Sequence, residues 1–419
     1  MSPEFALAPD FDRQDDQFSS AFAVLREAIE QRAFPAASIA VTHQSKLVAL
    51  KSFGKFVYEE DAGGTSLLSD VGRSGSLHPT DPNVTPATLF DLASLTKVIA
   101  TTTMAMILYE RGLLELDAPV IGIVPEFLLD STSNPDPRRH DVTFRMLLAH
   151  SSGLPAYEKL FLKAHSREAL LTAALTTPLS ADPGTRAEYS DIGFLVVGVA
   201  LERLAQESLD VFSQREVFGP LRMLNTTFNP PPDLRPKIPP TADEREDHCG
   251  ADTLVRQSPT TSQQPSESQQ KPRSAFRNRI IQGGVQDENT YVLGGIAPHA
   301  GLFSTAEDVA KFAFAMLHGG SIVRPETVVL FTRRDTTPGT SRALGWDTPS
   351  PPSASGKYFG PTSFGHLGYT GTSLWIDPDR ELSITLLTNR TWPDCSNQAI
   401  KQVRPRFHDA VVEALGKVR

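Results

Sequence analysis

The sequence predicts an α/β (α+β) fold in which an antiparallel sheet, flanked by N- and C-terminal helices, is interrupted by an inserted, mainly helical domain. Two strand patterns lie close together near the N-terminus, and two more form a hairpin pattern near the C-terminus. Stretches with helical spacing fill the chain between them. One sheet made from both ends of the chain accommodates this order.

The domain boundaries follow from the same pattern. We assign residues 16–90 and 342–419 to the sheet domain and residues 91–341 to the helical domain, and we expect residues 1–15 to be a flexible lead. Residues 230–275 contain nine of the 33 prolines and the run SPTTSQQPSESQQKP. Because this stretch has little to bury, we expect a low-complexity surface insertion there.

The N-terminal elements are a helix and two strands. Residues 18–32 have helical spacing, and residues 36–42 and 47–56 are typical of strands joined by a polar turn. Residues 59–86 are rich in Gly, Ser, Asp and Pro, which predicts a long loop.

Helical spacing then recurs through the middle of the chain, at 92–114, 141–149, 166–177, 192–206 and 305–318. Strand patterns return at 372–376 and 382–388, around a turn that contains Pro378. An amphipathic helix over 396–415 is expected to end the chain.

Composition excludes several classes of function. The net charge of −9 gives no general attraction to phosphates, so nucleic acid is not an expected partner. No segment approaches the roughly 18 apolar residues that a membrane span needs. Because the first residues do not form a signal peptide, we expect a cytoplasmic protein as written, or a periplasmic or secreted one if the N-terminus is processed. The oligomeric state stays open.

Metal and thiol chemistry are not expected either. Cys249 and Cys395 are too few for a disulfide framework or a four-cysteine zinc site, and we expect ordinary free thiols. The sequence has no H-E-x-x-H motif and no compact His/Asp cluster, so neither a metal nor another cofactor is expected. The absence of G-x-S-x-G disfavours an α/β-hydrolase.

One S-x-x-K motif stands out among three. The copy at 52–55 lies in a predicted strand, where side chains three apart face opposite sides, and the copy at 268–271 lies in the low-complexity insertion. Ser94 and Lys97 instead begin a strong helical pattern, where positions i and i+3 share a face. Because free N–H groups and a positive dipole end stabilise negative charge there, Ser94 is the candidate nucleophile.

Two further features are weaker on their own. Tyr189 stands at a loop-to-helix junction and can act as a general base if neighbouring cations lower its pKa. A partly buried tyrosine before a capping residue is the alternative. The run GHLGYTGT at 365–372 has glycines that let a substrate approach the backbone. A Gly-rich turn into a hairpin is the alternative there.

In this order, the three features resemble the serine β-lactamase and penicillin-binding superfamily, whose motifs are S-x-x-K, a Tyr or Ser triplet, and K-T-G. The tyrosine and the histidine of the second and third motifs point to its class C-like branch of β-lactamases, D,D-carboxypeptidases, D-aminopeptidases and carboxylesterases. The segments at 147–155, 220–223 and 294–304 are also similar. The resemblance covers about residues 20 to 415 without the insertion, and it implies the β-lactamase/transpeptidase-like fold.

The resemblance implies a role for each catalytic residue. Ser94 matches the acylated nucleophile, and Lys97 matches the lysine that takes or shares its proton. Tyr189 matches the general base of acylation, which also activates water in deacylation. The backbone N–H groups of Ser94 and Tyr369 match the two donors of the oxyanion hole.

It also implies that Asp191, His366 and Gly368 contact the substrate, with two departures from the family pattern. His366 occupies the cation position, but a histidine is only partly charged near neutrality, and Leu367 lacks a hydroxyl group. Both changes disfavour a dedicated β-lactamase. Asp191 stands where amide-binding members often carry asparagine, and it either binds a substrate N–H or ammonium group or caps the next helix.

Other polar residues in family-like segments have structural interpretations. His150 and His299 are expected to be satisfied histidines at packed turns. The acidic run from Asp287 to Asn289 is expected to order a loop over the cleft.

The sequence therefore predicts a cofactor-free serine hydrolase that forms an acyl-enzyme. We favour small acyl esters as substrates, with weak β-lactam hydrolysis as a side reaction. The alternatives are a D-amino-acid peptidase or D-Ala-D-Ala carboxypeptidase, and a non-catalytic penicillin-recognising protein. The expected partner is thus a small-molecule ester, a β-lactam or a D-amino-acid peptide.

Overall fold

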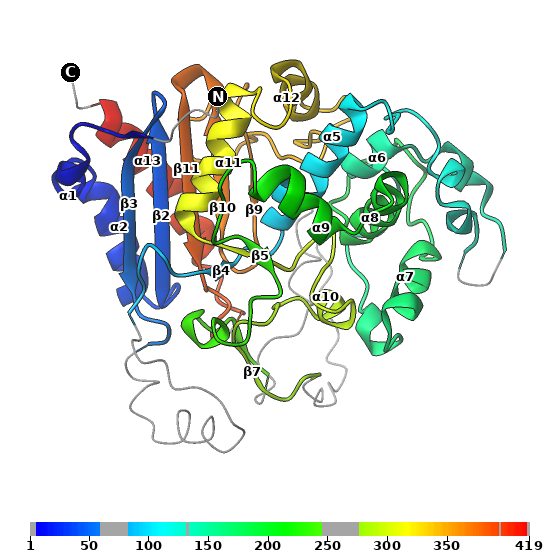
Figure 1. Ribbon diagram of the computed structural model, residues 1–419, viewed down its shortest axis with the longest axis horizontal. Coiled ribbons are helices and arrows are strands. Elements are labelled where there is room, and N and C mark those ends of the chain that lie inside the picture. Colours follow the sequence, from blue (N-terminus) through cyan, green and yellow to red (C-terminus); the bar gives the residue numbers. More distant parts are fainter. Residues whose placement is uncertain (1–5, 59–82, 131–133, 245–275, 394, 417–419) are drawn as a thin grey trace, which may run out of the picture.

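The computed structural model describes residues 6–58, 83–130, 134–244, 276–393 and 395–416. A six-stranded sheet with the order β1-β3-β2-β11-β10-β9 forms its centre (Figure 1). The short β1 is parallel to β3, and the other neighbours are antiparallel. The strands are β1 (Ala6–Leu7), β2 (Ala36–His43), β3 (Lys46–Gly54), β9 (Phe364–Leu367), β10 (Ser373–Asp377) and β11 (Leu382–Thr388). The prediction of one sheet built from both ends of the chain is confirmed.

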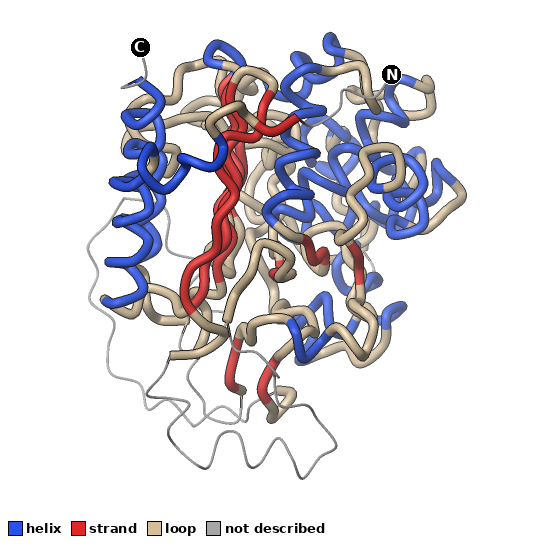
Figure 2. The backbone as a smooth tube through the Cα atoms, turned by 60° about the vertical axis from the view of Figure 1, so that its left-hand side comes forward, coloured by secondary structure: helices blue, strands red, loops and turns tan. Residues whose placement is uncertain are grey.

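Helices cover both faces of this sheet (Figure 2). On one face, α2 (Ser19–Glu30) and α13 (Ile400–Gly416) pack together, and their apolar residues form a core with the sheet that includes Phe22, Trp375 and Phe407. On the other face, α11 (Ala306–His318) packs on β2 and β11. α11, which the predicted boundary assigns to the helical domain, thus contacts the sheet and also shares the apolar core of the middle helices.

The remaining helices gather on the α11 side of the sheet and share one continuous apolar core. They are α5 (Thr103–Glu110), α6 (Phe144–Leu148), α7 (Arg167–Leu175), α8 (Asp191–Ala205), α9 (Leu209–Ser213), α10 (Glu288–Val292) and α12 (Pro325–Thr332). Two small sheets, β4 (Phe90–Asp91) with β8 (Leu302–Ser304) and β5 (Thr227–Phe228), and β6 (Ala242–Asp243) with β7 (Ile280–Ile281), join loops around the cleft.

Part of the predicted flexible lead is wrong. Within residues 6–15, β1 pairs with Lys46 and Leu47, a 3-10 helix (Phe11–Arg13) follows, and α1 (Gln14–Gln17) begins directly after it. The Gln14 side chain accepts a hydrogen bond from the Leu50 N–H at 3.0 Å. These contacts close the exposed edge of β3, which a hydropathy pattern does not signal because only two residues pair.

The predicted insertion is also smaller than expected. Residues 238–244 are buried, and β6 pairs with β7, whereas residues 231–233 are exposed. Prolines there rigidify a chain that still carries apolar side chains. Residues 245–275 lie outside the described residues, as does most of the loop predicted over 59–86, of which 59–82 are not described.

Cys395 departs from its prediction. It is disulfide-bonded and almost fully buried, so the expectation of a free thiol is wrong for this residue. Cys249 lies outside the described residues. No helix in the described ranges is long and apolar enough to cross a membrane.

His408 on α13 provides a test of the core by pH. Burial lowers the pKa of His408 to about 3, and the ring lies between Ala354 O and Ser373 Oγ. Below pH 6.5 the His408 imidazole becomes protonated in the unfolded chain but stays neutral in the folded protein. The unfolding free energy therefore decreases as the pH falls. When the pH is lowered from 6.5 to 5, the unfolding free energy of the wild-type protein should fall by about 2 kcal/mol more than that of His408→Asn. Urea unfolding at each pH measures both losses. Equal losses would contradict a buried neutral ring.

Candidate active site

The candidate nucleophile lies on a tight turn. Ser94 follows β4, and the preceding Ala93 has a positive φ of 47°. The Ala93 N–H donates to Asp91 Oδ1 at 2.8 Å, and Asp91 Oδ2 accepts the Gln286 N–H at 2.8 Å. This strained turn presents Ser94 to the cleft and holds it there by two loops.

The helix after Ser94 differs from the predicted one. The helical pattern at 92–114 becomes a π-helical segment, Lys97–Thr102, followed by α5, which ends at Glu110. A π-helical turn holds one more residue than an α-turn and is frequent at functional sites. The side chains of Ser94 and Lys97 nevertheless meet, as the motif predicts.

Lys97 is fully buried and makes three hydrogen bonds. Its Nζ donates to Ser94 Oγ at 3.0 Å, to Asp191 Oδ1 at 2.6 Å and to His299 O at 3.3 Å. Burial alone lowers the pKa of Lys97, but the Asp191 carboxylate and Tyr189 outweigh it and raise that pKa. Lys97 is therefore an ammonium group before the reaction begins.

The position of Asp191 corrects one of the two interpretations made from the sequence, the helix cap. Ser190, not Asp191, caps α8, because its Oγ accepts the Gly193 N–H at 2.9 Å. Asp191 lines the cleft, but its carboxylate is buried in the ion pair with Lys97. An asparagine at this position has no charge to hold the ammonium group in this way.

Tyr189 stands over the same ammonium group. Lys97 Nζ lies 4.8 Å from the centre of the Tyr189 ring, and the ring packs on His150 at 4.7 Å. His150 Nδ1 accepts the Ser190 N–H at 3.0 Å, which makes it a structural histidine. Burial raises the pKa of Tyr189 more than Lys97 and Ser94 lower it. A cation is present, but Tyr189 is a phenol at rest, so the condition set for a general base, a pKa lowered by neighbouring cations, is not met.

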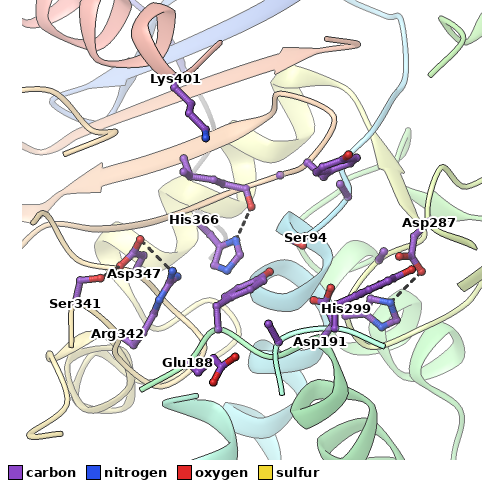
Figure 3. Close-up of a pocket in the computed structure, with 18 of the residues that line it drawn as sticks. Ser94, Glu188, Asp191, Asp287, His299, Ser341, Arg342, Asp347, His366 and Lys401 are labelled. Atoms are coloured by element: carbon purple, nitrogen blue, oxygen red, sulfur yellow. Dashed lines mark hydrogen bonds and ion pairs between the residues drawn. The ribbon is translucent and has the colours of Figure 1, made fainter. Parts of the chain in front are cut away.

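His366 is not a cation in this structure. It lies on β9, with Nδ1 at 2.8 Å from Leu367 O (Figure 3). Burial, Lys97 and Arg342 hold the pKa of His366 well below its usual value. Since the carbonyl only accepts, the proton is on Nδ1 and Nε2 carries a lone pair. Because its ring is neutral, His366 does not supply the positive charge expected at the cation position of the third motif.

Gly368 lines the cleft, but its lack of a side chain has a structural reason. A Cβ atom there would lie 2.0 Å from Thr372 Oγ1 and 2.6 Å from Leu92 O. Thr372 Oγ1 also donates to Leu92 O at 3.0 Å, beside the nucleophile turn. Gly368 therefore lets the third motif pack directly against the loop that carries Ser94.

Two buried arginines support the third motif, and sequence reasoning missed both. Arg404 on α13 donates to Gly368 O and Thr372 O, each at 2.8 Å. Arg390 donates to Tyr369 O at 2.8 Å. Arginine-to-carbonyl contacts leave no pattern in sequence, because their partners are backbone atoms.

Asp287 and His299 form the opposite wall. His299 Nε2 lies 3.0 Å from Asp287 Oδ1, and that same oxygen accepts the Thr290 N–H at 2.6 Å. Desolvation opposes the charge on Asp287, but His299 and these hydrogen bonds hold its pKa well below the usual range. The two residues order the loop before α10, which agrees with the interpretation from the sequence.

Most of these groups, though not the buried Lys97 and His150, line one cleft with a cavity volume of about 610 Å³. Ser94, Lys97, Tyr189 and Asp191 meet at its floor, while Ser94 and Tyr369 both line it. The cleft also contains Arg342, whose guanidinium carbon lies 5.0 Å from the Tyr189 ring centre. No motif from the sequence signalled Arg342, since its loop reaches the site only in three dimensions. In Figure 3, Arg342 and Asp287 lie on opposite sides of Ser94.

Comparisons with known proteins agree with this geometry. The Beta-lactamase family model matches residues 21–403. The chain is 30% identical to an N-acetylmuramyl-L-alanine amidase of Bacillus subtilis, over 85% of this chain and 77% of that protein. It is 28% identical to a putative D-alanyl-D-alanine carboxypeptidase of Salmonella agona, over 88% and 81%. The solved structure of EstCE1, a hydrolase with promiscuous acyltransferase activity, matches with a TM-score of 0.66 at 20% identity, covering 95% of this chain and 99% of that one.

Proposed function

Because the chain belongs to the β-lactamase family of serine hydrolases, we propose that it cleaves amide bonds of small charged peptides of the D-alanyl class through an acyl-enzyme on Ser94. The observation that carries this proposal is that the cleft contains charged groups of both signs: the Arg342 guanidinium group lies on one side of Ser94, next to Asp347, and the Asp287 carboxylate lies on the other. A neutral acyl ester has no charged groups to pair with these side chains, whereas a peptide carries both a carboxylate and an ammonium group. The name of the carboxypeptidase relative supports the D-alanyl class, and the name of the amidase relative supports amide cleavage.

The proton path follows from the protonation states. As Ser94 attacks the carbonyl, its proton passes to Tyr189 Oη, and the phenol passes its own proton to the leaving nitrogen. Deacylation runs the same way: the water proton goes to Tyr189, and the Tyr189 proton returns to Ser94 Oγ. Lys97 remains an ammonium group throughout and stabilises the negative charge that develops on Oγ. In this path a tyrosine that is neutral at rest suffices.

A substrate comparison tests the proposal. We expect kcat/KM for a D-Ala-D-Ala peptide to exceed the value for nitrocefin by at least tenfold. Hydrolysis of p-nitrophenyl acetate is also expected, because an activated ester needs less help from the leaving-group proton. A peptide that is not hydrolysed, beside efficient ester turnover, would overturn the peptidase proposal and restore the esterase favoured from the sequence.

Arg342 is the residue that we expect to bind the substrate's terminal carboxylate. Its ion pair with Asp347 is long, at 3.5 Å, and the guanidinium group is partly exposed in the cleft. Since His366 is neutral, Arg342 supplies the positive charge that the third motif lacks. Arg342→Gln should raise KM for the peptide about 10- to 100-fold, the value of one charge-assisted hydrogen bond, and change p-nitrophenyl acetate hydrolysis little. Steady-state kinetics on both substrates check this.

A matched control is Arg186→Gln. Arg186 also lines the cleft but is paired with Glu188 at 2.9 Å. The control should leave KM for the peptide within about twofold, because an exposed ion pair contributes little. Equal effects of the two substitutions would mean that only the overall charge of the cleft matters.

A further inference from the structure

The wall of the cleft opposite Arg342 contains the carboxylate of Glu288, which pairs with no other side chain among the described residues. Glu288 is the first residue of α10 and lines the cleft. Its neighbour Asp287 is occupied by His299 and the Thr290 N–H. Among the residues that the structure describes, the Glu288 carboxylate forms no hydrogen bond or ion pair with another side chain. It therefore differs from Asp191, which pairs with Lys97, and from Asp287, which pairs with His299.

Tyr157 supplies an independent second feature of the same wall. It lines the cleft, and its hydroxyl oxygen is buried without a hydrogen-bond partner in the described part of the chain. Burial, together with Asp287 and Glu288, holds the pKa of Tyr157 well above its usual value, so the hydroxyl stays neutral. A buried hydroxyl group without a partner is costly unless something binds to it.

The two groups are held in place relative to each other. Asn289, next to Glu288, donates from Nδ2 to Glu158 O at 2.9 Å and accepts the Phe161 N–H at 3.0 Å through Oδ1. Asn289 thus ties α10 to the segment that follows Tyr157. Two preformed polar groups on rigid segments lower the cost of ordering a ligand.

The electrostatics of this wall favour a cationic ligand. Burial and the Asp287 charge raise the pKa of Glu288 to about 7, although the Arg277 guanidinium group lowers it. The Arg277 guanidinium group donates hydrogen bonds to the Glu244 carboxylate, Val285 O and Gln286 O. A ligand that brings a positive charge would restore the ionised form of Glu288.

We propose that Glu288 and Tyr157 form a subsite for a cationic amino group on the acyl side of a peptide substrate. The Glu288 carboxylate accepts two ammonium hydrogens, and the Tyr157 hydroxyl oxygen accepts another. The acyl side follows from the cleft: if Arg342 binds the terminal carboxylate of the leaving group, the acyl part lies on the other side of Ser94. This inference rests on the proposed peptidase function.

The test uses two peptides that differ in whether the lysine amino groups are free or acetylated. Lys-D-Ala-D-Ala carries ammonium groups on its acyl side, and Nα,Nε-diacetyl-Lys-D-Ala-D-Ala carries none. Wild-type protein should prefer the free peptide by about tenfold in kcat/KM, the value of one charge-assisted contact. Glu288→Gln, which keeps the size of the side chain, should reduce this ratio to near one and leave the acetylated peptide within about twofold. Tyr157→Phe should reduce the ratio partly.

The control variant is Glu188→Gln. Glu188 lines the cleft but is paired with Arg186. Its replacement therefore removes a negative charge from the cleft without changing the subsite. It should keep the preference for the free peptide. A Glu288→Gln protein that keeps the wild-type ratio, or a wild type with no preference, would overturn the subsite.

A second readout separates this inference from the proposed function. Both peptides are also tested as inhibitors of p-nitrophenyl acetate hydrolysis, which needs no peptide cleavage. If neither peptide is cleaved, the peptidase proposal fails, yet the inhibition constants still test the subsite. A free peptide that inhibits wild type about tenfold more strongly than Glu288→Gln supports the subsite, and equal inhibition contradicts it.

Discussion

Lys97→Met is expected to lower kcat/KM at least about a thousandfold on both peptide and ester, because it removes the charge that stabilises the Ser94 alkoxide. The Nζ atom contacts Ser94 Oγ directly at 3.0 Å and lies over the Tyr189 ring. No other lysine contacts this pair among the described residues. Steady-state kinetics on folded protein, verified by circular dichroism, measure the loss.

Lys51→Met is the matched control. Lys51 also pairs with an aspartate, Asp15, at 2.8 Å, but both side chains are on the surface, with exposed fractions of 34% and 59%. Its replacement should leave kcat/KM unchanged. A Lys97→Met protein with activity within tenfold of wild type would show that the ammonium group is not part of the reaction.

Asp191→Ala is expected to have the largest effect on stability. It leaves the Lys97 ammonium group buried without its carboxylate, in a position with side-chain exposures of 0% and 8% for the two partners. Breaking a buried pair from one side costs about 3–5 kcal/mol of unfolding free energy. Asp191→Asn keeps a hydrogen-bond acceptor and should cost less. Urea unfolding measures both, and Asp15→Ala, the surface counterpart, should cost under about 1 kcal/mol.

The double variant Lys97→Met/Asp191→Leu separates stability from activity. Replacing both partners with apolar groups removes the unpaired charge, so much of the stability lost in Asp191→Ala should return. Activity should not return, because the ammonium group is still absent. A double variant as unstable as Asp191→Ala would mean that the loss comes from packing and not from the buried charge.

The sequence predicted those parts of the site that depend on local spacing. Ser94 and Lys97 meet because residues three apart on a helical turn are neighbours, whatever the rest of the fold does. Strand patterns at both ends of the chain likewise predicted the central sheet, since alternation and turn residues are local signals.

Contacts between distant segments were beyond such reasoning. The Lys97–Asp191 pair joins residues 94 positions apart, and the interpretation of Asp191 as a cap was wrong because Ser190 takes that place. The neutral state of His366 depends on burial and on the charges of Lys97 and Arg342, and of these the motifs signalled only Lys97. Arg342 and Glu288 face the cleft only after several loops have packed around it.

Trapping the acyl-enzyme tests the central claim most directly. Wild-type protein is mixed with Nα,Nε-diacetyl-Lys-D-Ala-D-Ala, quenched in acid within the first turnovers, and measured by intact mass and peptide mapping. We predict one adduct per chain, with the mass of the diacetyl-Lys-D-Ala acyl group, on the peptide that contains Ser94, and no adduct in Ser94→Ala. An adduct on another residue, or equal labelling of Ser94→Ala, would contradict Ser94 as the nucleophile.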